Sequence, residues 1–160
     1  MKKKASLLDN FFLVIILLVS ATTIILVFTM FSKINDKIQE SPDISIQGKE
    51  IMQNGNNKFV GLFDGLFLVV FVTMAIAAII FASQINTSPL FFPLAIIMYI
   101  LLIIVSAIVG NVFYKIVADP TLNPYALEFT IIPFFFNNIV KIMLGLAILM
   151  GIVMYARQQQ

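Results

Sequence analysis

Cysteine, histidine and tryptophan are all missing from this sequence of 160 residues. Cysteine and histidine are the usual ligands of zinc, haem and iron–sulfur centres, and histidine is the commonest general base near neutral pH. Their absence argues against metal and redox chemistry, and no disulfide can form in any compartment. The sequence also has no glycine-rich phosphate loop, nucleophile elbow or carboxylate dyad. We therefore expect no enzymatic activity, no metal site and no cofactor.

Charged residues are scarce as well. They make up 11% of the sequence, against 61% hydrophobic residues, and the mean hydropathy is +1.03. Soluble domains are about 25% charged and are seldom more than half apolar, so this composition excludes an ordinary soluble globular domain. The net charge is only +2 and the basic residues are scattered, so we expect no nucleic-acid binding.

Long uncharged runs are what the sequence has instead. Residues 11–31 contain no charged residue over 21 positions, and a helix of that length spans the roughly 30 Å of bilayer hydrocarbon. Basic residues before this run and small residues at 19–21 resemble a secretory signal, but apolar sequence continues to residue 31, so we expect an uncleaved anchor. Three more apolar blocks follow. The sequence therefore predicts an all-α integral membrane protein, one membrane domain over residues 1–160, with four transmembrane helices and a short polar loop after the first. The expected spans are residues 11–31, 60–83, 90–110 and 137–155.

Three segments connect the expected spans. In the polar loop, residues 32–58, we expect the first helix to continue for two or three turns and stop at residues 41–43, followed by a short second helix that ends at residues 54–55. This loop is either a solvated connector or a docking surface. Residues 84–88 predict a tight turn that makes spans two and three an antiparallel hairpin. Residues 119–136 predict an interfacial segment or a re-entrant lead into span four.

Two charged residues, Asp64 and Lys141, fall inside apolar blocks. Ionisable residues within a membrane are expensive and often functional. Spans two and four enter from the same face, so the two residues lie at similar depth and could form an intramembrane ion pair. Two other interpretations stay open: an interfacial position, with Asp64 near a helix start and Lys141 reaching the headgroups, or part of an ion or proton pathway.

Pairs of small residues four apart occur in the expected spans. Such pairs let helix backbones approach closely in lipid, where packing rather than water exclusion drives association. We expect them to serve packing within the bundle or between copies. The pairs are Gly61 with Gly65, Ala78 with Ala82, Ser106 with Gly110, and Ala147 with Gly151.

Three short strings carry a resemblance of layout: INTSPLFF at residues 85–92, NVFY at 111–114 and YAR at 155–157. With the hydrophobic layout around them, over about residues 59–157, they resemble small uncharacterised multi-span membrane proteins encoded by viruses of bacteria and archaea. The resemblance implies a membrane protein of a virus particle, such as a lipid-containing virion, or of the infected cell's membrane. It implies no particular functional residues.

A short, charge-poor helical protein without catalytic groups is suited to repetition in a membrane. We therefore expect a structural, multimeric component of a virion membrane or viral membrane assembly, located in the virion membrane or the host plasma membrane. Its expected partners are the lipid bilayer, further copies of itself, and capsid, spike or other membrane-complex proteins contacted through residues 32–58 and 119–138. Two alternatives stay open. A pore-forming or holin-like protein needs a polar stripe that no span shows, and an accessory subunit of a cellular membrane complex would co-purify with host proteins.

The orientation in the membrane follows from the first span. Basic residues number four on the side of the termini and five on the other side, so their count does not decide. The first helix and its basic flank usually dominate. We therefore expect both termini in the cytoplasm, or in the interior of a virion.

Overall fold

The computed structural model describes residues 8–84 and 91–158, which form four long helices and two short ones. Each long helix contains a stretch that is long and apolar enough to cross a membrane, with a mean hydropathy between 2.3 and 2.8. The all-α class and the four spans are thus confirmed. The helices are α1 (Leu8–Glu40), α2 (Ile46–Gln84), α3 (Phe91–Val117), α4 (Asn123–Ala126), α5 (Ile131–Asn137) and α6 (Ile139–Gln158).

Most of the apolar surface of these helices points outward. Large side chains such as Val69, Ile97 and Ile152 are more than half exposed, at 62%, 55% and 59%. Only 17–33% of each candidate span is buried inside the protein. A soluble bundle would place such faces against a core, so these faces lie against lipid. The chain is an integral membrane protein that contacts the bilayer.

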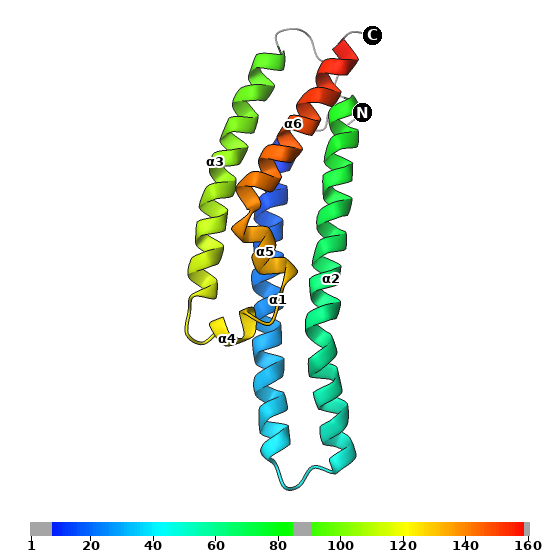
Figure 1. Ribbon diagram of the computed structural model, residues 1–160, viewed down its shortest axis with the longest axis vertical. Coiled ribbons are helices and arrows are strands. Elements are labelled where there is room, and N and C mark those ends of the chain that lie inside the picture. Colours follow the sequence, from blue (N-terminus) through cyan, green and yellow to red (C-terminus); the bar gives the residue numbers. More distant parts are fainter. Residues whose placement is uncertain (1–7, 85–90, 159–160) are drawn as a thin grey trace.

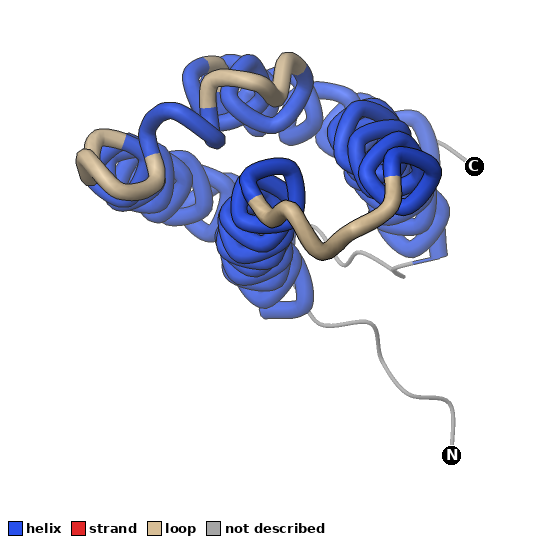
Figure 2. Tube along the Cα trace, turned by 90° about the horizontal axis from the view of Figure 1, so that it is seen from below, coloured by secondary structure: helices blue, strands red, loops and turns tan. Residues whose placement is uncertain are grey.

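The four long helices occupy the corners of a square (Figure 2). Helix α1 packs against α2 and α3, and α6 packs against the same two helices. Helices α2 and α3 run in opposite directions (Figure 1), but α1 and α6 fill the two corners between them. Spans two and three therefore do not pack as the expected hairpin, and most of the turn expected at residues 84–88 lies outside the described residues.

The polar segment after span one is mostly helical. Helix α1 ends at Glu40, close to the predicted stop, and α2 starts at Ile46, so the connecting loop is only residues 41–45. The prediction of a short second helix ending at residues 54–55 was wrong, because α2 continues through Gly55 without a break. A glycine inside a helix costs about 1 kcal/mol, and packing of α2 on α1 compensates for that cost.

Helices α1 and α2 are longer than a bilayer requires. Their 33 and 39 residues correspond to about 50 and 58 Å, against about 30 Å of hydrocarbon. Both extend past α4 at the same end of the bundle (Figure 1). We call residues 32–58, which carry the polar sequence, the projecting hairpin.

The segment between α3 and α6 folds back into the bundle. Helix α3 runs to Val117, past the expected end at residue 110, and a turn closed by Asn123 Nδ2 donating to Val117 O at 3.1 Å leads into α4. Helix α5 then buries Ile132, Phe135 and Phe136 against α2 and α3. The backbone leaves helical geometry at Asn138, with φ −113° and ψ 10°, and α6 begins at the next residue. Span four, Ile139–Ala156, thus begins directly after the break at Asn138.

Candidate functional site

A stripe of residues on one face of α1 contacts α2, both in the bundle and along the projecting hairpin. Within the membrane the stripe is apolar, and Phe28 at its end is fully buried. Beyond Phe28 the same stripe continues with Ser32, Asn35 and Gln39, of which Ser32 and Asn35 are 3% and 2% exposed. The spacings of four, three and four residues keep all of these on one face of a helix. The chemistry of the contact therefore changes from apolar to polar beyond Phe28.

Each polar residue of this stripe has a hydrogen-bond partner on α2. Ser32 Oγ donates to Asn56 Oδ1 at 2.9 Å, and Asn35 Nδ2 donates to Gln53 Oε1 at 3.0 Å. Gln39 Nε2 donates to Lys49 O at 2.9 Å, and Lys49 Nζ donates to Gln39 O at 2.7 Å. In every pair the two residue numbers add up to 88. The two helices thus keep one register over about two turns, and we call these six residues the polar seam.

A polar seam of this kind determines the register of the two helices more than it adds to their stability. Hydrogen bonds each contribute only about 0.5–1.5 kcal/mol net, but a polar group in a helix contact selects the register in which its partner is opposite. No buried side-chain nitrogen or oxygen lacks a hydrogen-bond partner among the described residues. The projecting hairpin is therefore a helix pair with a defined register and exposed outer faces.

A double-mutant cycle tests the seam. We expect Ser32→Ala and Asn56→Ala to be coupled by about 0.5–1.5 kcal/mol, because each removes the same hydrogen bond. Asn54 is exposed and lies two residues before Asn56 on α2, so Asn54→Ala is the matched control and should show no coupling with Ser32→Ala. Free energies of unfolding in mixed micelles measure both cycles. Equal coupling in the two cycles would contradict the seam.

Asp64 forms the second polar centre, at the level where the hairpin meets the bundle. Its side chain is 5% exposed. Oδ2 accepts the backbone N–H groups of Thr130 and Ile131, both at 2.7 Å, and Oδ1 accepts the N–H of Ile132 at 2.9 Å. These are the N–H groups of the N-cap residue Thr130 and of the first two residues of α5, which have no partner inside the helix. A negative charge is favourable at a helix N-terminus. One side chain of α2 thus caps α5 and holds the folded-back segment in place.

Aromatic rings surround this junction. Phe28 of α1 lies with its ring centroid 5.2 Å from Phe59, 5.3 Å from Phe129 and 6.2 Å from Tyr125. Phe67 of α2 lies 5.4 Å from Phe135. Edge-to-face and offset pairs of this kind contribute about 0.5–1.5 kcal/mol beyond their buried area. The rings tie α1, α2 and the α4–α5 segment together around the Asp64 cap.

The two charges singled out from the sequence have different partners. The Asp64 carboxylate is bonded to the backbone at the start of α5, whereas Lys141 is exposed and its Nζ lies 3.5 Å from Oδ1 of Asn138, the residue between α5 and α6. Asp64 therefore satisfies its charge with backbone donors. The sequence did not indicate this role, because the partners are main-chain groups 66 to 68 residues away.

The small residues fall into two groups. Ala78, Ala82, Ser106 and Ala147 are buried, and a Cβ on Gly110 would lie 3.0 Å from Ile139 Cγ2 and 3.2 Å from Phe136 O. These residues serve packing in the bundle. A Cβ on Gly61, Gly65 or Gly151 would meet nothing within 4 Å. Contact of these three glycines with another copy stays a prediction.

Two carboxyl groups outside the spans have shifted pKa values. Thr121 donates its hydroxyl and its backbone N–H to Asp119 Oδ1, which lowers the pKa of Asp119. Glu128, between α4 and α5, has a raised pKa because of partial burial and, second, the negative charge of Asp36. Asp36 lies on the projecting part of α1, so the α4–α5 segment and the hairpin are close enough to interact electrostatically.

The raised pKa of Glu128 predicts a pH effect on stability. A carboxyl group whose pKa is higher in the folded state makes folding more favourable as the pH falls through that pKa. We expect Glu128→Gln to stabilise the protein at pH 7 and to lose this advantage near pH 4, which is about the pKa of an unfolded glutamate. Unfolding temperatures at both pH values measure the effect. Glu50→Gln, on the exposed face of α2, is the control, and the same pH dependence in both variants would refute the assignment to Glu128.

Comparison of the chain with protein-family models, with curated proteins and with solved structures finds no match. The class that fold and site define is therefore a four-span membrane protein with a projecting hairpin.

Proposed function

We propose that this protein is a structural membrane component that presents the projecting hairpin to partner proteins. The observation that carries this proposal is the polar seam, which extends two transmembrane helices beyond the bundle in one register. A helix pair that is continuous with its membrane anchor holds its outer faces at a fixed height and angle. Such pre-organisation lowers the entropic cost of binding.

The groups of the bundle interior support a structural role rather than conduction. The hydroxyls of Thr22, Thr29 and Ser106 donate to the carbonyl four residues earlier in their own helices, at 2.7 to 2.8 Å. A water-filled path needs polar groups that face a shared lumen. We therefore propose a structural role in preference to the pore-forming alternative, and we propose no catalytic role.

We further propose that several copies act together and that the setting is a virion membrane or the membrane of an infected cell. There the hairpin would contact capsid or spike proteins. The support for this setting is the resemblance of about residues 59–157 to small membrane proteins encoded by viruses of bacteria and archaea. The accessory subunit of a cellular membrane complex would use the same hairpin with a different partner.

Site-directed crosslinking tests the role of the hairpin. The chain has no cysteine, so Asp43→Cys, in the exposed loop at the hairpin tip, gives a single thiol for a photoactivatable crosslinker. Ala156→Cys, exposed near the end of α6, is the matched control at the opposite end of the bundle. We expect a discrete adduct with one partner, at constant stoichiometry in native membranes or particles, from Asp43→Cys only.

Other outcomes would contradict the proposal or identify the setting. Equal labelling from both positions would mean that the hairpin is not the docking element. An unmodified hairpin together with ion leakage in reconstituted vesicles would favour the pore. Capsid or spike proteins in the adduct would support the viral setting, and a host membrane protein would support the accessory subunit.

A further inference from the structure

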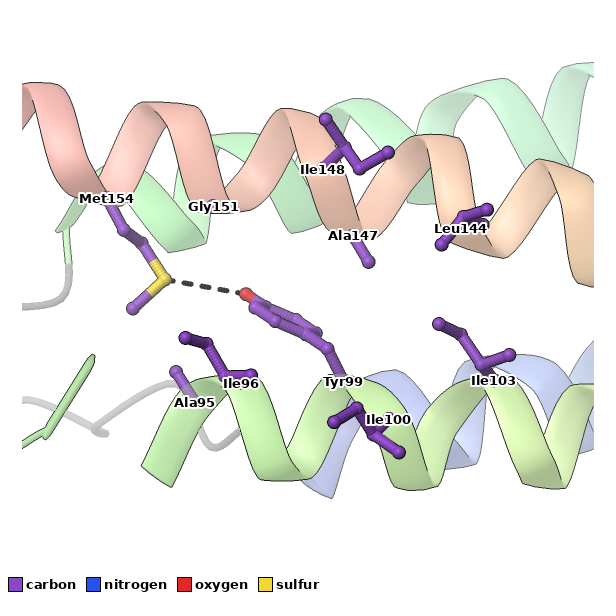
Figure 3. Close-up of a pocket in the computed structure, with 10 residues that line it drawn as sticks. All are labelled: Ala95, Ile96, Tyr99, Ile100, Ile103, Leu144, Ala147, Ile148, Gly151 and Met154. Carbon is purple, nitrogen blue, oxygen red and sulfur yellow. Dashed lines mark hydrogen bonds between the residues drawn. The ribbon is translucent and has the colours of Figure 1, made fainter. Parts of the chain in front are cut away.

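A groove opens between α3 and α6 at the end of the bundle opposite the projecting hairpin. It has a volume of about 190 Å³. Its walls are formed by Ala95, Tyr99 and Ile103 of α3 and by Ala147, Gly151 and Met154 of α6 (Figure 3). Both walls lie within candidate membrane spans, Pro93–Val117 and Ile139–Ala156. The mouth of the groove therefore opens to the lipid.

The groove results from the close contact of α3 with α6 near Gly110 and Ile139, at the ends of these helices that are nearer the projecting hairpin. At Gly110, α3 lies so close to the start of α6 and the end of α5 that an added Cβ would lie 3.0 Å from Ile139 Cγ2 and 3.2 Å from Phe136 O. From this point the helices diverge toward the opposite end of the bundle (Figure 1). Small side chains then leave the gap unfilled, since a Cβ on Gly151 would meet nothing within 4 Å.

The lining of the groove offers nothing to water or to a headgroup. Its one polar side chain, Tyr99, is 9% exposed and donates its hydroxyl to Met154 Sδ at 3.4 Å. This bond bridges α3 and α6 across the groove (Figure 3). The remaining walls are aliphatic. A water molecule needs two to four polar partners, and an empty gap forfeits dispersion contacts, so hydrocarbon is the filling that this lining favours.

We propose that the groove binds one hydrocarbon chain of a membrane phospholipid as a specific, slowly exchanging lipid. Along α3 it extends from Ala95 to Ile103, which is about 12 Å at 1.5 Å per residue. A groove of about 190 Å³ over this length has room for a single extended chain. A helix with its side chains is about 10–12 Å across, so a helix of a second copy does not fit into it, whereas an extended acyl chain does.

Two glycines of α6 provide a matched test. Gly151 lines the groove and Gly145 does not, and a Cβ on either would meet nothing within 4 Å. Each protein is reconstituted in vesicles of dioleoylphosphatidylcholine with deuterated chains and extracted into excess maltoside detergent. The retained deuterated lipid per protein is then counted by mass spectrometry, and the oligomeric state is measured in the same sample.

We expect the wild type and Gly145→Leu to retain about one lipid per chain, and Gly151→Leu to retain roughly tenfold less. The leucine side chain would fill part of the groove and remove about ten dispersion contacts of the acyl chain, which together correspond to about a tenfold change in affinity. Three results would overturn the proposal: no retained lipid in the wild type, equal retention in the two leucine variants, or a wild-type dimer that only Gly151→Leu dissociates. The last result would mean that a second copy covers the groove. None of these outcomes depends on a partner of the hairpin.

Discussion

Asp64→Leu is expected to destabilise the protein by about 3–5 kcal/mol, the range for removing one partner of a buried charged interaction. Leucine has a similar size but accepts no hydrogen bond. The N–H groups of Thr130, Ile131 and Ile132, which now donate to the carboxylate at 2.7–2.9 Å, would be left without a partner. Each unsatisfied buried donor costs about 1–3 kcal/mol. The α4–α5 segment should then detach from α2.

Two measurements check this expectation together. Unfolding in mixed micelles gives the change in free energy, and amide hydrogen exchange reports the N–H groups of residues 130–132 directly. Glu50→Leu removes an exposed carboxylate from the same helix. It should change the free energy of unfolding by no more than about 0.5 kcal/mol and leave the exchange of these amides unchanged. If Asp64→Leu keeps wild-type stability and full protection of these amides, the cap has no structural importance.

The number and length of the spans could be predicted because they depend on local composition. Uncharged runs of about 20 residues are set by the thickness of the bilayer, and the helix stop before residues 41–45 follows from turn-forming residues. The continuity of α2 through Gly55 could not be predicted in this way. It depends on tertiary packing, because the seam residues Gln53 and Asn56 on either side of Gly55 are bonded to α1.

The polar seam did leave a signal in the sequence. Ser32, Asn35 and Gln39 continue the spacing of the apolar stripe of α1, and Lys49, Gln53 and Asn56 repeat it in reverse on α2. Such polar residues at contact spacing are recognisable when both helices are considered together. The Asp64 cap left no comparable signal, because a carboxylate can find main-chain donors anywhere in the fold. Its partners depend on where α5 folds back.

The small residues also combine a feature that the sequence predicts with one that it does not. A small residue four positions from another is compatible with a close helix contact, but the sequence does not say which pair makes it. The structure places Gly110 against the α5–α6 break and leaves Gly61 and Gly65 open. The difference arises from the square arrangement of helices, in which α3 and α6 share a contact and the Gly61 face of α2 points away from the bundle.

Gly110→Leu is expected to destabilise the protein by about 1–3 kcal/mol or more, as overpacking of a close contact does. The added Cβ alone would lie 3.0 Å from Ile139 Cγ2 and 3.2 Å from Phe136 O. The first neighbour is a side chain that can turn away. The second is a backbone oxygen beside the break at Asn138, so α3 and the start of α6 would have to separate.

Gly145 supplies the control for this prediction. It lies in α6 with nothing within 4 Å of an added Cβ, so Gly145→Ala gains helix propensity, up to about 1 kcal/mol, without a clash. Gly110→Ala has the same gain but should show no net stabilisation, because the clash cancels it. Unfolding free energies in mixed micelles give the difference. Equal stabilisation by both alanine variants would mean that α3 and α6 are not joined at Gly110, and the divergence that opens the groove between them would then need another cause.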